Sequence, residues 1–369
     1  MPVRSRPNPI DEPGVNSGRH DATLPIDVDA AIEPLIAEAL TALDGRSSLL
    51  AGMIRYHLGY TNEDFTPAPD QVRIQSRGKR LRPAIAMLTC AATGGDPLTA
   101  APVGVAIELL HNFTLIHDDI QDKSETRRHR PTVWNLWGIE QAINAGDALF
   151  AASQLPILGL TRAGVPAATV VQLIDAFNRM TIEIVEGQTL DLGFEGRADI
   201  SADDYLEMIS GKTAAIVRFA ASSGAVLGGA SRETRDRFAE FGLALGLGYQ
   251  IRDDALGVWG VADVTGKATA DDIRRRKQSL PIVLLRQRVS QSEANELDVI
   301  YRAPSIGDTG VARVLALLHR YEVAGEISAL VDAYHAKALT ALKSAADDRD
   351  NAAVTALSGL AGRLALRDA

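Results

Sequence analysis

Long segments rich in alanine and leucine limit what this chain can fold into. In these segments apolar residues recur every three to four positions, the period of an amphipathic helix, and no run alternates as a half-buried strand would. Short breaks rich in glycine, proline, asparagine and aspartate separate them, at residues 62–67, 93–97, 193–196 and 303–307. We therefore predict an all-α protein whose helices are joined by loops.

Domain organisation follows from where the composition changes. The chain up to about Asp21 is rich in proline, asparagine, glycine and arginine, and it contains no apolar block that could serve as the core of a signal peptide. Beyond it the composition stays even, and 369 residues of which 46% are hydrophobic can bury a large core. We predict a disordered tail at residues 1–25 and one large domain at residues 26–369.

Composition also argues against several kinds of partner and compartment. The formal net charge of −9 speaks against nucleic acid as the main partner. The most apolar stretch, residues 148–160, is too short to span a bilayer and contains polar residues, so we expect no stable membrane insertion. Cys90 is the only cysteine, which excludes a disulfide within the chain and fits a reducing, cytoplasmic setting.

Two aspartate clusters follow apolar runs. The first contains Asp118, Asp119 and Asp122, and the second is Asp253-Asp254. Carboxylates beside apolar runs cost free energy when they lose water unless cations compensate them, so the two clusters suggest a shared site for divalent metal. The alternative is that each cluster caps a helix end that faces water.

Helical spacing places polar residues on common faces. If residues 106–122 form one helix, Glu108 and His111 share a stripe roughly 100° wide with the first cluster. Gln250 shares a face with the second cluster in the same way. A polar ribbon on an otherwise apolar helix faces a partner or a cavity, and an acidic one needs cations nearby.

Basic segments accompany the clusters. Lys79 and Arg82 lie three apart, on one side of a turn if that segment is helical. The other basic positions are Arg127-Arg128, Lys212-Thr213, Lys267 and the run Arg274-Arg275-Arg276-Lys277. Each alone could be a solvated face, but together they indicate anion clamps around metal. Gly211-Lys212-Thr213 is not a phosphate-binding loop of nucleotide-binding proteins, because Leu206 replaces the upstream glycine and no strand precedes it.

Together these residues resemble the trans-isoprenyl diphosphate synthases from about Pro34 to near the end of the chain. The matching motifs, in order, are Gly78-Lys79-x-x-Arg82-Pro83, His111 with Leu115-Ile116-His117-Asp118-Asp119-x-x-Asp122, Arg127-Arg128-x-x-Pro131-Thr132, Gly187-Gln188-x-x-Asp191, Gly211-Lys212-Thr213 and Gln250-Ile251-Arg252-Asp253-Asp254. The resemblance implies a single helical bundle around a deep central cavity, usually in a homodimer.

The resemblance also implies roles for individual residues. Three Mg²⁺ ions, for which Mn²⁺ can substitute, would bridge the clusters to an allylic diphosphate. Asp118, Asp122 and Asp253 would be direct ligands, with Asp119 and Asp254 nearby or acting through water. Contacts with the allylic diphosphate are expected from Arg127, Lys212, Thr213, Gln250, Lys267 and Lys277. Lys79, Arg82, His111 and Arg128 would hold isopentenyl diphosphate.

Two details concern activity and product. The second motif of the family usually ends in aspartate, but here Gly257 stands at that position and cannot bind metal. We expect activity to survive with altered metal affinity. Phe113 and Thr114 lie just before the first cluster, where the family sets product length, and this pattern resembles the type that forms the twenty-carbon geranylgeranyl product.

Alternatives remain open at this point. The product could be farnesyl or longer. A terpene cyclase would ionise a similar diphosphate but would not need the second clamp of Lys79, Arg82 and Arg128. A non-catalytic subunit of a heteromeric synthase would fit Gly257, although such subunits usually lack an intact first cluster.

Overall fold

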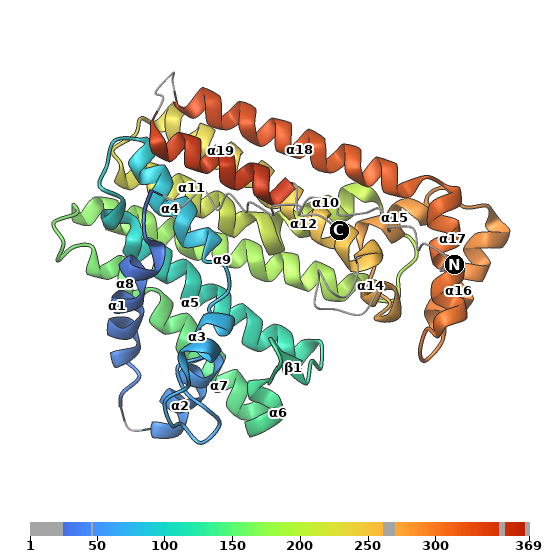
Figure 1. The fold of residues 1–369 in the computed structure, drawn as a ribbon, viewed down its shortest axis with the longest axis horizontal. Helices are drawn as coiled ribbons and strands as arrows, with labels where there is room; N and C mark the ends of the chain where they lie inside the picture. The colour runs from blue at the N-terminus through green and yellow to red at the C-terminus, as the bar shows by residue number, and fades with distance from the viewer. Residues whose placement is uncertain (1–24, 46, 261–269, 347–350, 366–369) are drawn as a thin grey trace, which may run out of the picture.

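The fold is all-helical, as predicted. A computed structural model describes residues 25–45, 47–260, 270–346 and 351–365, and apart from one short hairpin its regular elements are helices (Figure 1). The hairpin pairs β1 (Thr126–Arg127) with β2 (Arg130–Pro131) directly after the first aspartate cluster. Most of the predicted tail lies outside the described residues, so the predicted domain limits stay predictions.

The helices fall into three groups along the chain. The N-terminal group consists of α1 (Val28–Thr41), α2 (Ser48–His57), α3 (Asp70–Ser76), α4 (Leu81–Ala92) and α5 (Pro97–Gln121). The middle group consists of α6 (Val133–Trp137), α7 (Ile139–Ser153), α8 (Leu155–Gly159), α9 (Ala167–Phe194), α10 (Ala202–Ile209), the π-helical turn η1 (Ser210–Ala214), α11 (Ala215–Leu227) and α12 (Arg232–Trp259). The C-terminal group consists of α14 (Asp271–Arg274), α15 (Leu280–Arg286), α16 (Gln291–Arg302), α17 (Asp308–Arg320), α18 (Val323–Ala346) and α19 (Ala352–Ala365).

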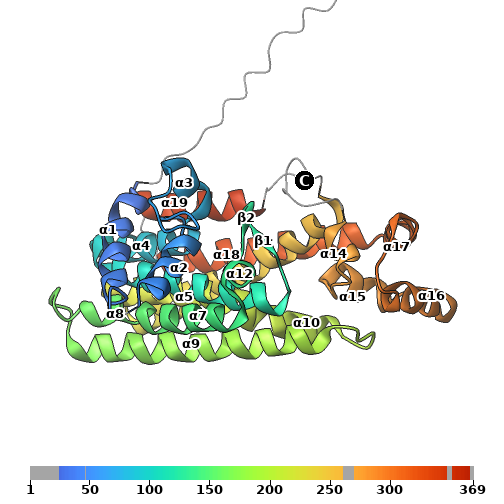
Figure 2. The ribbon, with the colours of Figure 1, turned by 90° about the horizontal axis from the view of Figure 1, so that it is seen from below.

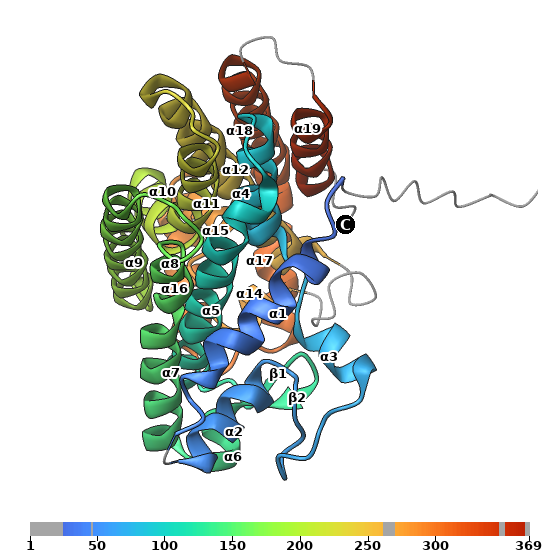
Figure 3. The ribbon, with the colours of Figure 1, turned by 90° about the vertical axis from the view of Figure 1, so that its left-hand side faces the viewer.

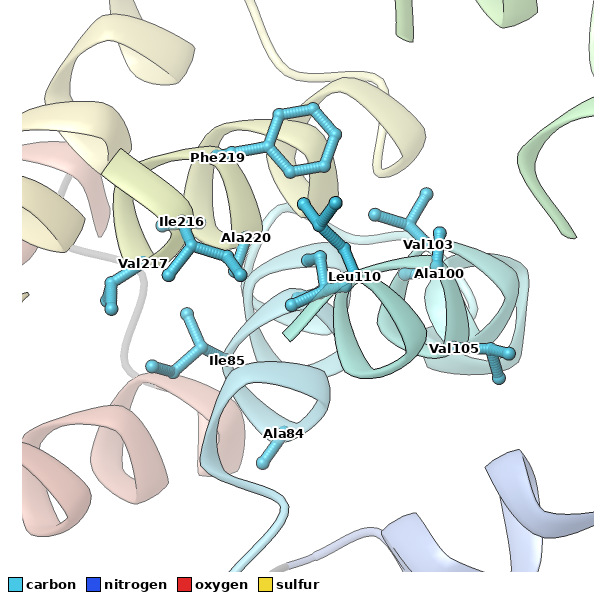
Figure 4. Packing of buried hydrophobic residues seen from close by; sticks show 14 of the residues in the cluster. Ala84, Ile85, Ala100, Val103, Val105, Leu110, Ile216, Val217, Phe219 and Ala220 are labelled. Carbon is cyan, nitrogen blue, oxygen red and sulfur yellow. The ribbon is translucent and has the colours of Figure 1, made fainter. Parts of the chain in front are cut away.

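The core forms where α4, α5 and α11 pack together. Ile85 from α4, Val103 and Leu110 from α5, and Ile216 and Phe219 from α11 belong to one buried cluster (Figure 4). Buried apolar area of this kind supplies most of the stability of such a bundle. On its other side α11 packs against α12, which in turn packs along α18.

A second buried cluster occupies one end of the molecule. It joins α10, the last part of α12 and helices α14–α17, and Figure 2 shows α16 and α17 at that end, with α9 along one long edge. Tyr334 of α18 packs against both clusters, so α18 and α12 tie them together. At the other end α1 contacts α4 and α5, and α19 contacts α4 (Figure 3).

The predicted breaks are confirmed, whereas one local prediction is wrong. Residues 62–67, 93–96, 195–196 and 303–307 lie outside helices. Lys79 and Arg82 do not share a helical turn, because α4 begins only at Leu81, after Gly78 and Arg80 at φ values of 68° and 50°. One described helix, α5, is long and apolar enough to cross a membrane, but 67% of that apolar window is buried inside the fold, as in the core helix of a soluble protein.

The close approach of α11 to α4 depends on Gly224. A Cβ atom there would lie 2.2 Å from the backbone oxygen of Ala86. We expect Gly224→Ala to lower the free energy of unfolding by about 1–3 kcal/mol, because backbone atoms must move apart. The midpoint of urea denaturation measures this change.

Gly325→Ala in α18 is the matched control for this prediction. No atom lies within 4 Å of a Cβ at position 325, so helix propensity should leave stability unchanged or slightly higher. A Gly224→Ala variant as stable as the native protein would contradict the packing argument.

Candidate active site

The first aspartate cluster lies at the C-terminal end of α5. Asp118 and Asp122 are one turn apart, and Asp122 is the capping residue of the helix. The Lys212 ammonium lies 3.9 Å from Asp118 and forms an ion pair with Asp191 of α9. Burial raises the pKa of Asp118, and Asp122 and Asp191 raise it further, while Lys212 opposes them. This end of the bundle therefore gathers more carboxylates than the lysine can neutralise.

Two glycines allow Lys212 to reach these carboxylates. A Cβ at Gly187 of α9 would lie 2.2 Å from the Lys212 backbone nitrogen, and one at Gly211 would lie 2.6 Å from the Glu183 oxygen. The backbones of α9 and η1 are thus in direct contact. A π-helical turn of this kind is a local departure from the α-helix that often marks functional sites. Both glycine motifs are visible in the sequence, whereas the contact of Asp191 with Lys212 is not.

The second cluster is connected to Lys212 through neighbouring side chains. Thr213 donates a hydrogen bond to Gln250 at 2.9 Å, and Gln250 donates one to Asp254 at 3.0 Å. Asp254 is buried and also accepts hydrogen bonds from the Tyr205 hydroxyl and the Leu280 amide. Burial raises the pKa of Asp254 to about 7, although these donors lower it. Asp253 beside it is less buried.

The segment after α14 contacts the segment that follows the first cluster. Arg275, which follows α14, donates a hydrogen bond to Ser124 at 3.2 Å, and Ser124 follows the first cluster. Through Lys212, Thr213 and Gln250 the two aspartate clusters lie at the same end of the helices.

The basic residues around α4 depend on an internal ion pair. Arg80 is buried between Glu108 at 3.1 Å and Glu33 at 2.9 Å. Tyr60 donates a hydrogen bond to Glu33 at 2.8 Å, which fixes that carboxylate. These contacts hold Arg80 in its left-handed backbone conformation and so fix the positions of Lys79 and Arg82 on either side of it.

Arg82, Arg127, Arg128 and His111, which we call the cationic cluster, lie near one another. Burial lowers the pKa of His111 well below its usual value, and Arg82, Arg128 and Arg127 lower it further. Burial likewise lowers the pKa of Arg128, which Glu108 opposes. Arg82 is half-buried, and its Nε atom is shielded from solvent and has no hydrogen-bond partner among the described residues. The cluster thus carries surplus positive charge on half-buried side chains, which favours binding of an anion.

Asp119 faces the cationic cluster. Its carboxylate accepts hydrogen bonds from Arg127 Nε at 2.9 and 3.0 Å, and the Arg127 terminal nitrogen lies 2.8 Å away. Both oxygens of Asp119 are therefore engaged, as are those of Asp254 in the other cluster. These two residues were the ones expected to act near metal or through water.

Gly257 has a structural explanation that the sequence did not reveal. A Cβ at this position would lie 2.2 Å from Oδ2 of Asp272, so the buried Asp272 carboxylate fills the space beside the glycine. Asp272 also raises the pKa of Asp254, after the larger effect of burial. A carboxylate from α14 thus stands where the motif lacks one. The only hint in the sequence was its place just before the Arg274–Lys277 run.

The remaining predicted site residues have few contacts with the two aspartate clusters or the cationic cluster. Lys277 is exposed, and Lys267 lies outside the described residues. Phe113 packs against Phe150 of α7 with ring centroids 5.3 Å apart, while the Thr114 hydroxyl donates to the His111 carbonyl at 2.8 Å. Thr114 lies one turn before Asp118 and shares its face. The described pockets do not include the deep central cavity, which stays a prediction.

The carboxylates fit a hard divalent cation by their chemistry. Asp118, Asp122 and Asp191 offer oxygen atoms, the ligands that Mg²⁺ and Mn²⁺ prefer, and their mutual repulsion would be relieved by a cation. In the described part of the chain no three His, Cys, Asp or Glu side chains are already close enough to hold an ion. Binding would therefore require the carboxylates to converge.

The chain is similar to known proteins of one family. The model of a family described as polyprenyl synthetase matches residues 68–318. A Mycobacterium tuberculosis farnesyl diphosphate synthase is 39% identical over 251 residues, which are 68% of this chain and 66% of the relative, just under two thirds of its length. A geranylgeranyl diphosphate synthase from the same organism is 40% identical over 278 residues, covering 75% of this chain and 77% of the relative.

A solved structure shows the same fold. The polyprenyl synthetase from Streptomyces coelicolor superposes with a TM-score of 0.81 at 32% identity, covering 91% of this chain and 97% of that one. The predicted isoprenoid synthase type of helical fold is therefore confirmed.

The fit between Gly257 and Asp272 predicts a coupled effect on stability. Gly257→Ala should lower the free energy of unfolding by about 1–3 kcal/mol, because the new Cβ would overlap the Asp272 carboxylate. Asp272→Ala removes that carboxylate, so the double variant should lose less than the sum of the two single losses, by at least about 0.5 kcal/mol. Urea denaturation of the four proteins measures the coupling.

Gly242→Ala is the control on the same helix. Its Cβ would lie 2.6 Å from the Val217 oxygen, so its cost should not depend on Asp272. Additive losses for Gly257→Ala and Asp272→Ala would show that the two positions do not compete for space.

Proposed function

This chain belongs to the polyprenyl synthetase family, and on that premise we propose that it joins isopentenyl diphosphate to an allylic diphosphate. The observation that carries the proposal is the pairing of two groups of opposite charge at one end of the bundle. Surplus carboxylates gather around Lys212, and the cationic cluster lies beside them, linked through the Asp119–Arg127 ion pair. Two anionic substrates and divalent cations would balance both groups.

Each substrate would have its own set of contacts. The cationic cluster suits isopentenyl diphosphate, with Lys79, Arg82, His111 and Arg128 as the proposed contacts. The allylic diphosphate would lie nearer the carboxylates, with Arg127, Lys212, Thr213 and Gln250 as proposed contacts and Lys267 and Lys277 joining from the next segment. Asp118, Asp122 and Asp253 would bind Mg²⁺, with Asp119 and Asp254 acting indirectly because their oxygens are already engaged.

The reaction follows from charge. The bond between the allylic carbon and oxygen breaks, and its electron pair leaves with the diphosphate. Bound Mg²⁺ would stabilise the negative charge that develops on this leaving group. The Lys212 ammonium lies beside Asp118 and Asp191, so it is placed to stabilise the same charge. The double bond of isopentenyl diphosphate then attacks the allylic cation, and loss of a proton to the released diphosphate leaves a chain five carbons longer.

We infer that the product is geranylgeranyl diphosphate. The proposal rests on Phe113 and Thr114 before the first cluster, and relatives named for both the farnesyl and the geranylgeranyl product match this chain at similar identity. Thr114 is small and lies on the face of Asp118, which leaves room for a longer chain below the site. We propose a cytoplasmic location, in keeping with the single buried Cys90.

We predict that the purified protein incorporates radiolabelled isopentenyl diphosphate when Mg²⁺ and dimethylallyl, geranyl or farnesyl diphosphate are present. Geranylgeraniol should be the product after dephosphorylation. Farnesol or a longer alcohol would keep the reaction and reject the proposed chain length. No incorporation with any of the three allylic substrates would reject the reaction for the isolated chain.

The Arg82→Ala variant separates elongation from cyclisation. An elongating enzyme should lose roughly 10²-fold in kcat/KM for isopentenyl diphosphate, because a half-buried cation of the clamp is removed. A terpene cyclase has no second diphosphate to hold, so its turnover of an allylic diphosphate alone should hardly change.

We propose that the protein is a homodimer formed through α7 and α9. Both helices lie along the same outer side of the molecule (Figure 3) and expose the apolar side chains Ile139, Ile143, Val171, Ile182 and Val185. Val171, Ile182 and Val185 fall on one face of α9 by helical spacing. An exposed apolar face of this kind suits a second copy of the chain.

Light scattering at micromolar concentration should give the mass of a dimer, and the double variant Ile182→Glu with Val185→Glu should give that of a monomer. Charges on the proposed interface would have to be buried without partners in the dimer. Val299→Glu on α16 is the control, because Val299 is 73% exposed and lies on a helix outside the proposed interface. A double variant that stays dimeric would place the interface elsewhere.

A further inference from the structure

His57, the last residue of α2, has a buried ring nitrogen without a partner. No solvent reaches Nε2, and it forms no hydrogen bond to any described residue. His57 also precedes residues 68–318, which the family model matches. A buried polar atom left in this way costs free energy unless something binds it.

His57 lines a small pocket whose wall contains three arginines. Arg127, Arg128 and Arg130 line it together with Ser76 and Asp119. Its volume of about 20 Å³ holds one water-sized group, so an oxygen atom of a larger ligand fits whereas the whole ligand does not. Asp119 is already paired with Arg127, so the pocket keeps a surplus of positive charge.

Tyr56 holds His57 in this position. The Tyr56 hydroxyl donates a hydrogen bond to the Pro131 backbone carbonyl at 2.9 Å. The Arg130 guanidinium donates one to the Tyr56 backbone carbonyl, also at 2.9 Å. The Arg130 guanidinium also stacks on the Tyr56 ring, 3.9 Å from its centroid. The end of α2 is thereby fixed to the hairpin that carries Arg127 and Arg128.

The pocket adjoins the proposed contacts of isopentenyl diphosphate. Arg128 lines the pocket and also influences His111, and His57 itself is close enough to affect His111. The Arg128 guanidinium lies against Gly78, since a Cβ there would be 3.2 Å from its terminal nitrogen. A diphosphate held by Arg82, Arg128 and His111 would therefore present an oxygen atom to this pocket.

We propose that His57 is a further contact of isopentenyl diphosphate, donating a hydrogen bond from Nε2 to an oxygen of its diphosphate. This inference rests on the proposed function. It assigns to α2, outside the part of the chain matched by the family model, a direct share in holding the second substrate.

The electrostatics of the pocket support this role. Burial, helped by the nearby Arg127 and Arg128, lowers the pKa of His57 to about 3, although the Asn112 side chain opposes them. The imidazole is therefore neutral before a ligand binds and adds no repulsion to the arginines. A neutral imidazole carries one N–H, and in the tautomer with its proton on Nε2 it can donate a hydrogen bond to a diphosphate oxygen.

The test compares three proteins in steady-state assays with each substrate varied in turn. His57→Asn removes the donor at the Nε2 position and should raise KM for isopentenyl diphosphate about tenfold, while KM for the allylic diphosphate changes less than twofold. His57→Gln returns an N–H near that position and should recover most of the loss. Equal increases for both substrates, no increase, or no recovery with glutamine would overturn the proposal.

Two further measurements separate loss of the His57 donor from a loosened hairpin and from an inactive enzyme. Tyr56→Phe removes the neighbouring hydrogen bond to Pro131, so it reports the effect of loosening the hairpin without removing the His57 donor. Calorimetric titration with inorganic diphosphate tests the contact without turnover. If the native protein is inactive, the proposed function fails, but the binding measurement still tests His57. Weaker diphosphate binding by His57→Asn than by the native protein and His57→Gln supports His57 as an anion contact. Equal binding by all three proteins rejects it.

Discussion

Arg80 lies buried between carboxylates from two helices, and the arrangement of the cationic cluster depends on this ion pair. Glu33 reaches it from α1 and Glu108 from α5, which are far apart in sequence. A buried guanidinium without such partners would carry a large desolvation cost. The pair fixes the segment before α4, and that segment sets the positions of Lys79 and Arg82. Glu108 also offsets the charge of Arg128, so one carboxylate serves several cations.

At the site itself, charges are only partly compensated by partners of opposite sign. Around Lys212 negative charge exceeds positive charge, and in the cationic cluster the excess is positive. The Asp119–Arg127 pair joins the two groups. Such surplus charge lowers the stability of the free protein and raises its affinity for ions that compensate both groups, a compromise common at functional sites. Glycine contacts between α9 and η1 make the crowding sterically possible.

Much of this could be predicted from the sequence because helices give regular spacing. A helical period of 3.6 residues places Glu108, His111 and the first aspartate cluster on one stripe of α5. The same period places Gln250 and Asp254 on one face of α12, where they form a hydrogen bond. The turn before α4 was misjudged, because Arg80 adopts a left-handed conformation that only tertiary ion pairs explain. Asp272 and His57 were missed for another reason. Their importance lies in what they approach across the fold, and no local pattern carries that information.

The contacts of α1 and α2 determine how long a segment must be if it is exchanged between relatives. The family match begins at residue 68, yet Glu33 and Tyr56 come from before it, and α18, packed along α12, comes after residue 318. Exchanging only the matched segment between relatives would separate buried charges from their partners. Chimeric proteins from this family therefore need crossover points outside α1 and α19, so that compensating residues are inherited together.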